Sequence, residues 1–444
     1  MTPDQCPVLD WAASGGMALT GFSDEAPLAS PAGSFARLQG VADDLAAVTA
    51  RIGTEVRADP AELIAGRAAL AGLSRQGQLS AGGATRLLRA ADGWCAITLS
   101  RADDLAALPA VLGVLGLEAL APPGWAPDLD EARAVAWPAL ATAAGSRTAA
   151  DLTNAARLLG LPAATLPLGR PPARTFPPGR TTSIAAPSAA ASLAGALVAD
   201  LSSMWAGPLC ARLLGLAGAR VIKVESADRP DGARSGNQAF YDWLHAGHES
   251  LVLPLRTDRG RSLLSGLLQA ADVVIEASRP RALTQLGLAP RSLAHKDGQV
   301  WLSITGYGRD NPERVAFGDD AAVAGGLVGW AGTGEPVFCA DAVADPLTGI
   351  AGALAVAQSL AGGGGQLIDL PMRAVAATFA ASTVPGHGEH ELSPDGSFVS
   401  CPALGRRQAI QPPRPPAPAR GRAAVLGADT EAISSWLDSS RHHR

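Results

Sequence analysis

The chain has 444 residues, of which 47% are hydrophobic and 17% are charged. This length predicts two or three domains, and the apolar content is sufficient for large cores. The net charge of -5 argues against a nucleic-acid partner, because no basic excess is present to neutralise phosphates. The five cysteines are scattered without C-x-x-C spacing, which is typical neither of a disulfide framework nor of a zinc site.

The beginning of the chain does not resemble a signal peptide, since it carries Asp4 and Asp10 and lacks a basic segment. The apolar run from Ala185 to Leu201 is interrupted by Pro187 and Gly195, unlike a membrane span. We therefore expect a cytoplasmic protein with no membrane partner.

Two proline-rich stretches, Pro167 to Pro187 and Pro402 to Ala424, lack hydrophobic periodicity and are expected to be extended linkers or surface arms. They predict the following organisation: a small α+β region at 1–166, a linker at 167–190, an α/β domain at 191–380, an extended segment at 381–424, and a C-terminal helix and tail at 425–444.

In the N-terminal region, apolar residues at helical spacing predict helices over Arg57 to Leu73 and Thr148 to Leu159. Between them, Leu87 to Leu99 is typical of a β-hairpin, with a turn at Asp92-Gly93 followed by alternating residues. Ser80 to Gly83, just upstream, is predicted to be a flexible turn.

The central region alternates short apolar runs with amphipathic segments, which indicates a Rossmann-like parallel sheet buried on both faces. In such sheets, ligands bind beyond the carboxyl ends of the strands. The first strand ends in DLSSMWAGP, Asp200 to Pro208, which lacks the glycines of a dinucleotide fingerprint and disfavours a nicotinamide enzyme. The predicted strands are 196–201, 220–225, 250–255, 272–276 and 300–305, and the predicted helices are 207–216, 260–270, 282–286 and 430–437.

The run VADLSSMWAGPLCARLLGLAGARVIKVE, Val198 to Glu225, resembles the opening of class III CoA-transferases, the CaiB/BaiF family. Relatives in that family include formyl-CoA transferase and α-methylacyl-CoA racemase. Further similar segments follow in the family's order: Leu251 to Leu268, Ala271 to Leu288, Val300 to Gly308, Val343 to Leu360 and Gly362 to Met372. The resemblance implies a class III CoA-transferase fold of the α/β class.

The N-terminal region resembles the same family out of order. Ala81 to Ile97 and Leu152 to Leu166 are similar to segments of the family's small domain, which normally follows the central region. Arg422 to Leu437 is similar to the ordinary C-terminal helix. The resemblance therefore implies a rearranged member, with a smaller α+β domain placed N-terminally.

The family's nucleophilic aspartate corresponds to Asp345, in VADPLTG. In the transferases, this carboxylate forms covalent intermediates with the acyl group and with CoA, whereas in the racemase branch it moves a proton. By local pattern alone, Asp345 followed by Pro346 is typical of a helix N-cap with proline at the first helical position. Both roles are compatible.

Gly82 and Gly83 resemble the glycines that lie over the catalytic aspartate in family transferases, where backbone N–H groups can stabilise an oxyanion. A plain turn is the alternative. Asp319 stands where the racemase has a histidine, so that Asp319 with Asp320 could form a proton shuttle or cap a helix.

For CoA, the resemblance implies contacts after three strands. Trp205 could stack on adenine or pack in the core, and Arg234 could bind phosphate. HAGHES, His245 to Ser250, replaces a segment that is often basic in the family. The implied CoA-binding residues are Trp205, Ala206, Arg234, Ser278, Arg279 and Pro280.

No metal site and no permanently bound cofactor are expected. His387 and His390 would form a chelating pair only on a helix, and Pro385, Gly386 and Gly388 favour a loop there.

The leading hypothesis is therefore a CoA-transferase that acts on an acyl-CoA and a carboxylic acid through Asp345, with coenzyme A entering as part of the substrate. The alternatives are an acyl-CoA racemase or isomerase, and a degenerate CoA-binding subunit without activity. The resemblance implies a homodimer, possibly interlocked.

Overall fold

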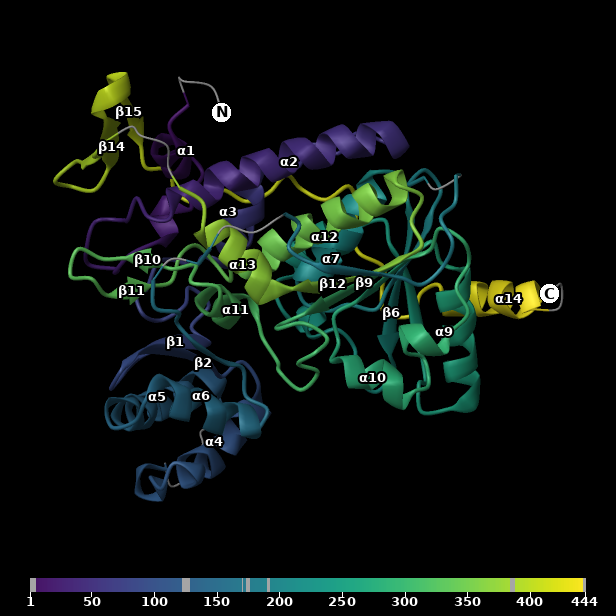
Figure 1. Ribbon diagram of the computed structural model, residues 1–444, viewed down its shortest axis with the longest axis horizontal. Coiled ribbons are helices and arrows are strands. Elements are labelled where there is room, and N and C mark those ends of the chain that lie inside the picture. The colour runs from purple at the N-terminus through teal and green to yellow at the C-terminus, as the bar shows by residue number, and fades with distance from the viewer. Residues whose placement is uncertain are drawn as a thin grey trace.

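The computed structural model describes residues 5–121, 128–169, 171–172, 176–189, 192–383 and 388–441. Figure 1 shows a large α/β body, a smaller unit built around β1 and β2 below it, and a terminal helix, α14, at the far right. None of the helices among the described residues is long and apolar enough to cross a membrane.

The large body is built on a seven-stranded sheet with the order β4-β12-β9-β8-β5-β6-β7. Every neighbouring pair is parallel except β4 with β12. This confirms the predicted α/β fold with a Rossmann-like parallel sheet. The strands are β4 (Arg180–Ser183), β5 (Leu197–Asp200), β6 (Arg220–Ser226), β7 (Glu249–Leu253), β8 (Val273–Glu276), β9 (Val300–Thr305) and β12 (Gln366–Pro371).

Helices cover both faces of this sheet, and successive strand residues feed opposite cores. Val198 belongs to the cluster on one face and Ala199 to the cluster on the other, as the alternation of side chains along a strand requires. The first face carries α2 (Ala32–Ile52), α7 (Ala206–Leu216), α12 (Ala344–Ala361) and α13 (Met372–Ala380), and the second carries α9 (Asp258–Ala270), α10 (Pro280–Gln285) and α14 (Thr430–Arg441).

α7 and α12 approach each other closely because α12 has a glycine at the contact. A Cβ at Gly349 would lie 2.8 Å from the Ala206 carbonyl oxygen and 2.8 Å from the Leu209 Cβ. Only glycine fits here without displacing the backbone of α7.

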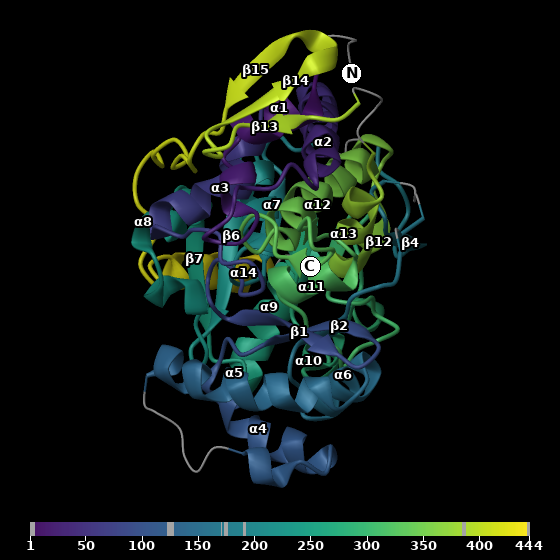
Figure 2. The ribbon, with the colours of Figure 1, turned by 90° about the vertical axis from the view of Figure 1, so that its left-hand side faces the viewer.

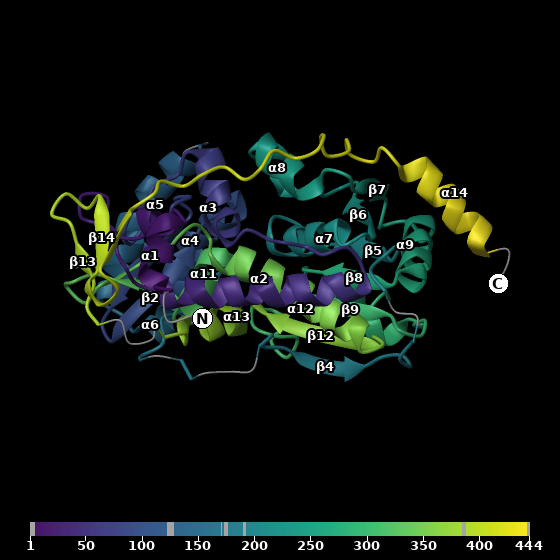
Figure 3. The ribbon, with the colours of Figure 1, turned by 90° about the horizontal axis from the view of Figure 1, so that it is seen from above.

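The first three helices, α1 (Pro7–Ala13), α2 and α3 (Pro60–Ala71), pack in the core of the large body. This differs from the expectation that 1–166 forms one small region. In α2, Leu38, Leu45 and Val48 are buried in the core that contains α12, and Figure 3 shows the two helices side by side. Helical spacing predicted that α3 exists, but an amphipathic pattern does not specify which core a helix joins.

The smaller unit has its own core under a three-stranded sheet. The predicted hairpin is present, but the pairing of Ala90 with Gly93 places its turn at Ala91-Asp92, one residue earlier than predicted. The predicted second helix begins after Thr148, whose hydroxyl caps it. The unit comprises β1 (Thr85–Ala90), β2 (Gly93–Thr98), β3 (Ala163–Thr165), α4 (Ala102–Val114), α5 (Leu129–Gly145) and α6 (Ala149–Leu158).

After α13, the chain forms a separate sheet of β13 (Glu391–Leu392), β14 (Phe398–Cys401) and β15 (Arg406–Ala409). Residues 410–418 then form no helix or strand. Figure 3 shows this arm running past α3 and α8 (Gln238–His245) towards α14. Hydrogen bonds from Ala417 to Glu62 (2.9 Å) and from Ala423 to Asp242 (2.9 Å) attach the arm to these helices.

Candidate active site

Four aspartates gather where the large body meets the smaller unit. Asp319 and Asp320 belong to α11 (Gly318–Ala324), Asp341 lies in the preceding loop of α12, and Asp345 lies in the first turn of α12. Asp320 and Asp341 are buried, whereas Asp319 and Asp345 are partly exposed. We refer to these residues as the aspartate cluster.

Asp345 is the second residue of α12 and not its N-cap. The helix begins after Val343, one residue before Asp345. A turn at Ala340 and Ala342, whose φ values are 53° and 41°, directs the chain into the helix at this point. The capping geometry that the local pattern predicted is therefore absent. This left-handed backbone in two alanines is strained, and such strain is concentrated at functional sites in proteins.

The carboxyl of Asp345 lies against the backbone of α11. The backbone N–H of Gly318 donates to it, and a Cβ at Gly318 would be 2.4 Å from its Oδ2. Burial raises the pKa of Asp345 to about 7, Asp319 and Asp341 contribute to the rise, and Arg67 and the Gly318 N–H oppose it. At neutral pH, this carboxyl is therefore divided between its acid and its base form.

Arg67, on α3, is the positive group of the cluster, and sequence reasoning missed it. Its guanidinium makes a bidentate ion pair with Asp341, with distances of 2.8 and 3.0 Å. It also attracts Asp319 and Asp345, lowering the pKa of each. Burial still raises the pKa of Asp341 to about 6, with the charge of Asp319 adding to it and Arg67 opposing.

The smaller unit reaches the cluster through two paired threonines of its hairpin. Thr85 donates to Asp319 (3.1 Å) and Thr98 donates to Asp320 (3.3 Å), while their own hydroxyls lie 3.0 Å apart. Asp320 also accepts from the backbone N–H of Phe317 at 2.8 Å, so the predicted capping role belongs to Asp320. Burial raises the pKa of Asp319, and raises that of Asp320 to about 8.

The glycine turn lies beside the same cluster within one chain. Ser80 forms a side-chain hydrogen bond with Asp319, and an ideal Cβ at Gly82 would be 3.5 Å from Nη2 of Arg67. The Gly83 N–H closes the turn on the Ser80 carbonyl at 2.8 Å, and the φ of +75° at Gly83 suits glycine. The turn and Asp345 thus share Arg67 and Asp319 as neighbours.

A group of arginines lies beyond the carboxyl end of β8, where the sequence predicted CoA contacts. Burial lowers the pKa of Arg279, and the nearby charges of Arg281, Arg101 and Arg229 lower it further. Arg101 pairs with Asp104 and Arg281 with Glu313, whereas Arg229 is exposed. Ser278 is exposed and Pro280 partly exposed at this edge. Guanidinium groups in such a group suit phosphate.

Trp205 and Ala206, which follow β5, are buried, with exposed fractions of 3% and 4%. The Trp205 ring packs edge-on against Phe240, with centroids 5.2 Å apart, and lies below the Arg67 guanidinium at 5.2 Å. The core-packing alternative describes these surroundings, since both neighbours cover the indole.

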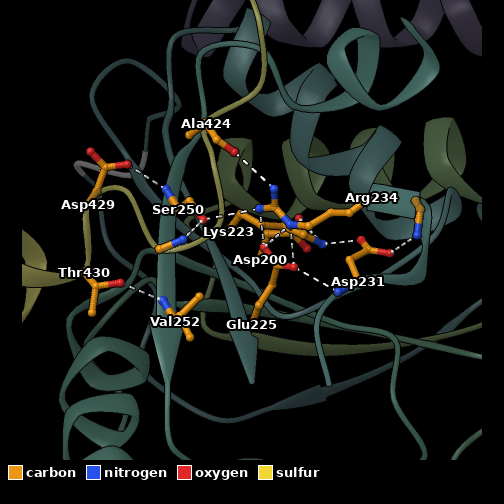
Figure 4. Close-up of polar contacts among 12 residues, drawn as sticks. Asp200, Lys223, Glu225, Asp231, Arg234, Ser250, Val252, Ala424, Asp429 and Thr430 are labelled. Atoms are coloured by element: carbon orange, nitrogen blue, oxygen red, sulfur yellow. Dashed lines mark hydrogen bonds and ion pairs between the residues drawn. The ribbon is translucent and has the colours of Figure 1, made fainter. Parts of the chain in front are cut away.

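The guanidinium of Arg234 is engaged in structural contacts (Figure 4). Its Nε donates to Glu225 at 2.9 Å, its Nη1 donates to the Ala424 carbonyl at 3.2 Å, and its Nη2 donates to Ser250 at 3.3 Å. The expected phosphate contact would compete with these partners. The residue instead links β6, β7 and the C-terminal arm, a role that its position in the sequence did not suggest.

Beside Arg234 lies a second buried charge, Lys223, which is only 2% exposed. Its ammonium is 2.8 Å from Asp231 and 4.0 Å from Asp200 (Figure 4). We refer to Asp200, Lys223, Glu225, Asp231 and Arg234 as the β6 charge network.

The sequence-based reasoning on metal binding considered His387 with His390. His387 lies outside the described residues. The structure brings His390 instead beside Cys6 and Cys401, a grouping that the sequence analysis missed because these residues are far apart in the chain.

The model of CoA-transferase family III matches residues 193–407. The chain is similar to the succinate–glutarate CoA-transferase of Agrobacterium fabrum, with 33% identity over 202 residues, covering 40% of this chain and 50% of that protein. It is also similar to the succinyl-CoA–D-citramalate CoA-transferase of Chloroflexus aurantiacus, with 29% identity over 191 residues, covering 39% and 47%.

Among solved structures, a CAIB/BAIF family protein from Brucella suis aligns with a TM-score of 0.39 and 30% identity, covering 43% of this chain and 55% of that one. The chain spans about half the length of the curated relatives it matches.

Proposed function

We propose that the protein transfers CoA from an acyl-CoA to a carboxylic acid, with Asp345 as the nucleophile, because residues 193–407 match the model of CoA-transferase family III. The observation that carries the proposal is the partly exposed Asp345 carboxyl, which lies within a group of aspartates and has a pKa of about 7. Both named relatives above are CoA-transferases of dicarboxylic acids, which supports an acid of this kind as acceptor.

The proposed reaction begins when the ionised Asp345 attacks the thioester carbonyl. The C–S bond breaks, CoA leaves as a thiolate, and a mixed anhydride remains on Asp345. The thiolate then attacks the Asp345 carbonyl, which releases the first acid and leaves an aspartyl-CoA thioester. The second acid repeats the two steps in reverse and regenerates the carboxylate. Covalent catalysis of this kind divides one difficult exchange into easier steps.

The neighbours of Asp345 can favour each step. The Gly318 N–H and Arg67 stabilise the carboxylate that attacks. The Gly82-Gly83 turn lies next to Arg67, and its Gly82 N–H is proposed to donate to the oxyanion that forms at the carbonyl, since the Gly83 N–H already donates to the Ser80 carbonyl. Arg67 also provides charge for an incoming carboxylate, since its side chain is 28% exposed.

The phosphates of CoA are proposed to bind the arginines beyond β8, Arg279 and Arg229, beside the exposed Ser278. This edge holds the carboxyl ends of parallel strands, where ligands of such sheets bind. Arg101 of the smaller unit also lies near Arg279, so the bound phosphates would touch both parts of the chain.

A homodimer is proposed on the family resemblance. The contact of the glycine turn with the cluster lies within one chain, so this part of the site does not depend on a second copy. Light scattering on the purified protein would measure the mass of the assembly, and a monomer with full activity would contradict the dimer.

The test is to incubate the protein with succinyl-CoA, quench it, and search for an adduct on the peptide that contains Asp345. We expect a CoA or acyl adduct that hydroxylamine removes, converting the aspartate into its hydroxamate. Asp345→Asn should show no adduct, while Asp258→Asn, at a fully exposed carboxyl on α9, should label as the parent chain does. Labelling of Asp345→Asn at another residue, or no labelling across a panel of acyl-CoA donors despite CoA binding, would reject Asp345.

A second function, acyl-CoA racemisation, is favoured by one observation. Asp319 lies close enough to Asp345 to raise its pKa, so the two carboxyls could exchange a proton with the α-carbon of a bound thioester. Deuterium entering that carbon from solvent, without CoA reaching an added acid, would support this function over transfer.

A further inference from the structure

Three residues with metal-binding side chains meet next to the beginning of α1. Cys6, His390 and Cys401 each present a ligand atom, and the three atoms lie within 4.8 Å of one another. The thiols are buried, with exposed fractions of 1% and 0%, and the His390 imidazole is partly exposed. None of the five cysteines, all within the described residues, forms a disulfide.

The three residues lie at the ends of three elements. Cys6 immediately precedes α1, His390 immediately precedes β13, and Cys401 is the last residue of β14. Figure 2 shows β13, β14 and β15 beside α1, at the end of the molecule opposite α4. His390 and Cys401 follow Cys6 by 384 and 395 positions in the chain, and the fold brings all three side chains together. Chance placement of so few cysteines and histidines would rarely do this.

We propose that Cys6, His390 and Cys401 bind a zinc ion that fastens the β13–β15 sheet to α1. Two sulfurs and one imidazole nitrogen are ligands that Zn²⁺ prefers, and a water molecule would complete the tetrahedron. The partly exposed face of His390 leaves the site open to that water.

The distances suit this proposal. A tetrahedral ion with Zn–S of about 2.3 Å and Zn–N of about 2.0 Å separates sulfur and nitrogen by roughly 3.5 Å. The Cys6 Sγ is 3.0 Å from the His390 Nε2, the length of a hydrogen bond between thiol and imidazole. An opening of about half an ångström therefore converts this hydrogen-bonded pair into two ligands of an ion.

The charges also balance. Each thiol loses its proton to solvent, two S–Zn bonds form, and one nitrogen lone pair of neutral His390 forms the third bond. Two thiolates and one Zn²⁺ make a neutral unit, which avoids the cost of burying an unpaired charge. Burial raises the pKa of the Cys6 thiol, and the backbone N–H groups of Leu9 and Val8 act in the opposite direction, so they would support the sulfur once the ion has displaced its proton.

The ion would supply stability that this sheet cannot draw from its own size. β13 has two residues and β14 and β15 have four each, which is short for an independent sheet. β14 and β15 contact α1 and so link this sheet to the large body. The proposed ion would add a bond from the residue before α1 to the residue before β13 and to the last residue of β14.

The test measures metal in the full chain, purified under reducing conditions without added chelator or metal. We expect about one zinc per chain by mass spectrometry. We also expect that Co²⁺ in its place gives thiolate-to-cobalt charge-transfer absorption. His390→Ala and Cys401→Ser should weaken zinc binding by at least about 100-fold, because the loss of a residue that only hydrogen-bonds to a metal ligand already lowers metal affinity by about 10–100-fold. Cys95→Ser, at a buried thiol of the smaller unit, is the matched control and should bind as the parent chain does.

Thermal unfolding gives a second readout. Zinc should raise the Tm of the parent chain and of Cys95→Ser, a chelator should reverse the rise, and His390→Ala should show neither effect. Zinc well below one per chain after reconstitution, or equal binding by His390→Ala and Cys401→Ser, would overturn the proposal. So would a Cys6–Cys401 disulfide that forms in the absence of reductant while the reduced chain binds no metal.

Discussion

The aspartate cluster and the β6 charge network are both buried groups of charges, but they differ in how their charges are paired. In the β6 charge network, three carboxyls share the two cations Lys223 and Arg234. In the aspartate cluster, the single guanidinium of Arg67 attracts the three carboxyls of Asp319, Asp341 and Asp345, and the charge of Asp319 acts on the buried Asp320. The first arrangement joins elements of the fold through nearly matched charges, whereas the second has a clear excess of carboxyls over cations.

The difference separates structural charges from chemically active ones. In the β6 charge network, Glu225 and Asp231 each have a cation at hydrogen-bonding distance, whereas burial raises the pKa of Asp200, which lies 4.0 Å from the Lys223 ammonium. In the aspartate cluster, burial raises all four pKa values. Groups whose pKa is raised towards 7 by burial and by like charges are typical of catalytic sites. Substitutions in the two groups should therefore have different effects.

The largest expected effect is on catalysis at Asp345. Asp345→Asn removes the nucleophile while keeping its shape, so transferase turnover should fall at least about 10⁴-fold, as for other covalent nucleophiles. CoA binding, measured by calorimetry, should change little. A variant that keeps more than a tenth of the parent turnover would show that the cluster does not act through this residue.

The second effect is on folding, in the β6 charge network. Lys223→Met leaves Asp200 and Asp231 buried without their cation, and should lower the free energy of unfolding by about 3–5 kcal/mol. Urea unfolding followed by circular dichroism measures this loss. Lys296→Met is the control, since Lys296 pairs with Asp272 where both side chains are 38% exposed, and it should cost less than about 1 kcal/mol. Equal losses for the two variants would contradict a structural role for the network.

A third effect concerns the pH dependence of stability. Asp320 is fully buried, and burial raises its pKa to about 8, above the value of about 4 expected in the unfolded chain. The folded state therefore holds the proton between pH 4 and 8 while the unfolded state has lost it, and this contribution to stability declines as pH rises through that range.

Asp320→Asn should remove this decline, because the amide cannot ionise. At pH 9 the variant should be more stable than the parent by about 2 kcal/mol, less than the roughly 5 kcal/mol of the full pKa shift, since an amide accepts more weakly from Phe317 and Thr98. At pH 4 the advantage should vanish. Unfolding curves at both pH values measure it, and a constant difference would disprove the raised pKa.

The sequence predicted the sheet well because its strands carry their own signal. β5, β8 and β9 are short and mostly apolar runs, which a sheet buried on both faces requires, and β6 interrupts its apolar residues with Lys223 and Glu225. β4 was missed inside the predicted linker, because Arg180–Ser183 is exposed and polar, and it forms a strand only by pairing at the edge with β12. Local pattern contains no information about such a partner.

Within the site, the resemblance indicated Asp345 and the glycine turn, but no local pattern indicated Arg67. An arginine on an amphipathic helix is ordinary in sequence, and its role arises from α3 packing beside the loop that contains Asp341, 274 residues later. The same limit applies to Arg234 and to the cysteines of the proposed zinc site. Contacts between distant segments decide these roles, and one sequence does not reveal them.

The smallest expected effect tests whether Arg67 tunes the cluster by charge or by geometry. Arg67→Lys keeps a cation beside Asp319, Asp341 and Asp345 but loses the two-pronged pairing at 2.8 and 3.0 Å. Transferase activity should rise with pH as Asp345 ionises near pH 7, and a weaker cation should move this rise to higher pH by less than about one unit. The pH profile of kcat/KM measures the shift. A move to lower pH would mean that Arg67 does not stabilise the ionised cluster. An unchanged profile with a raised KM for the acceptor acid would mean instead that Arg67 acts mainly on the incoming carboxylate, because binding is then lost without a change in the charge balance around Asp345.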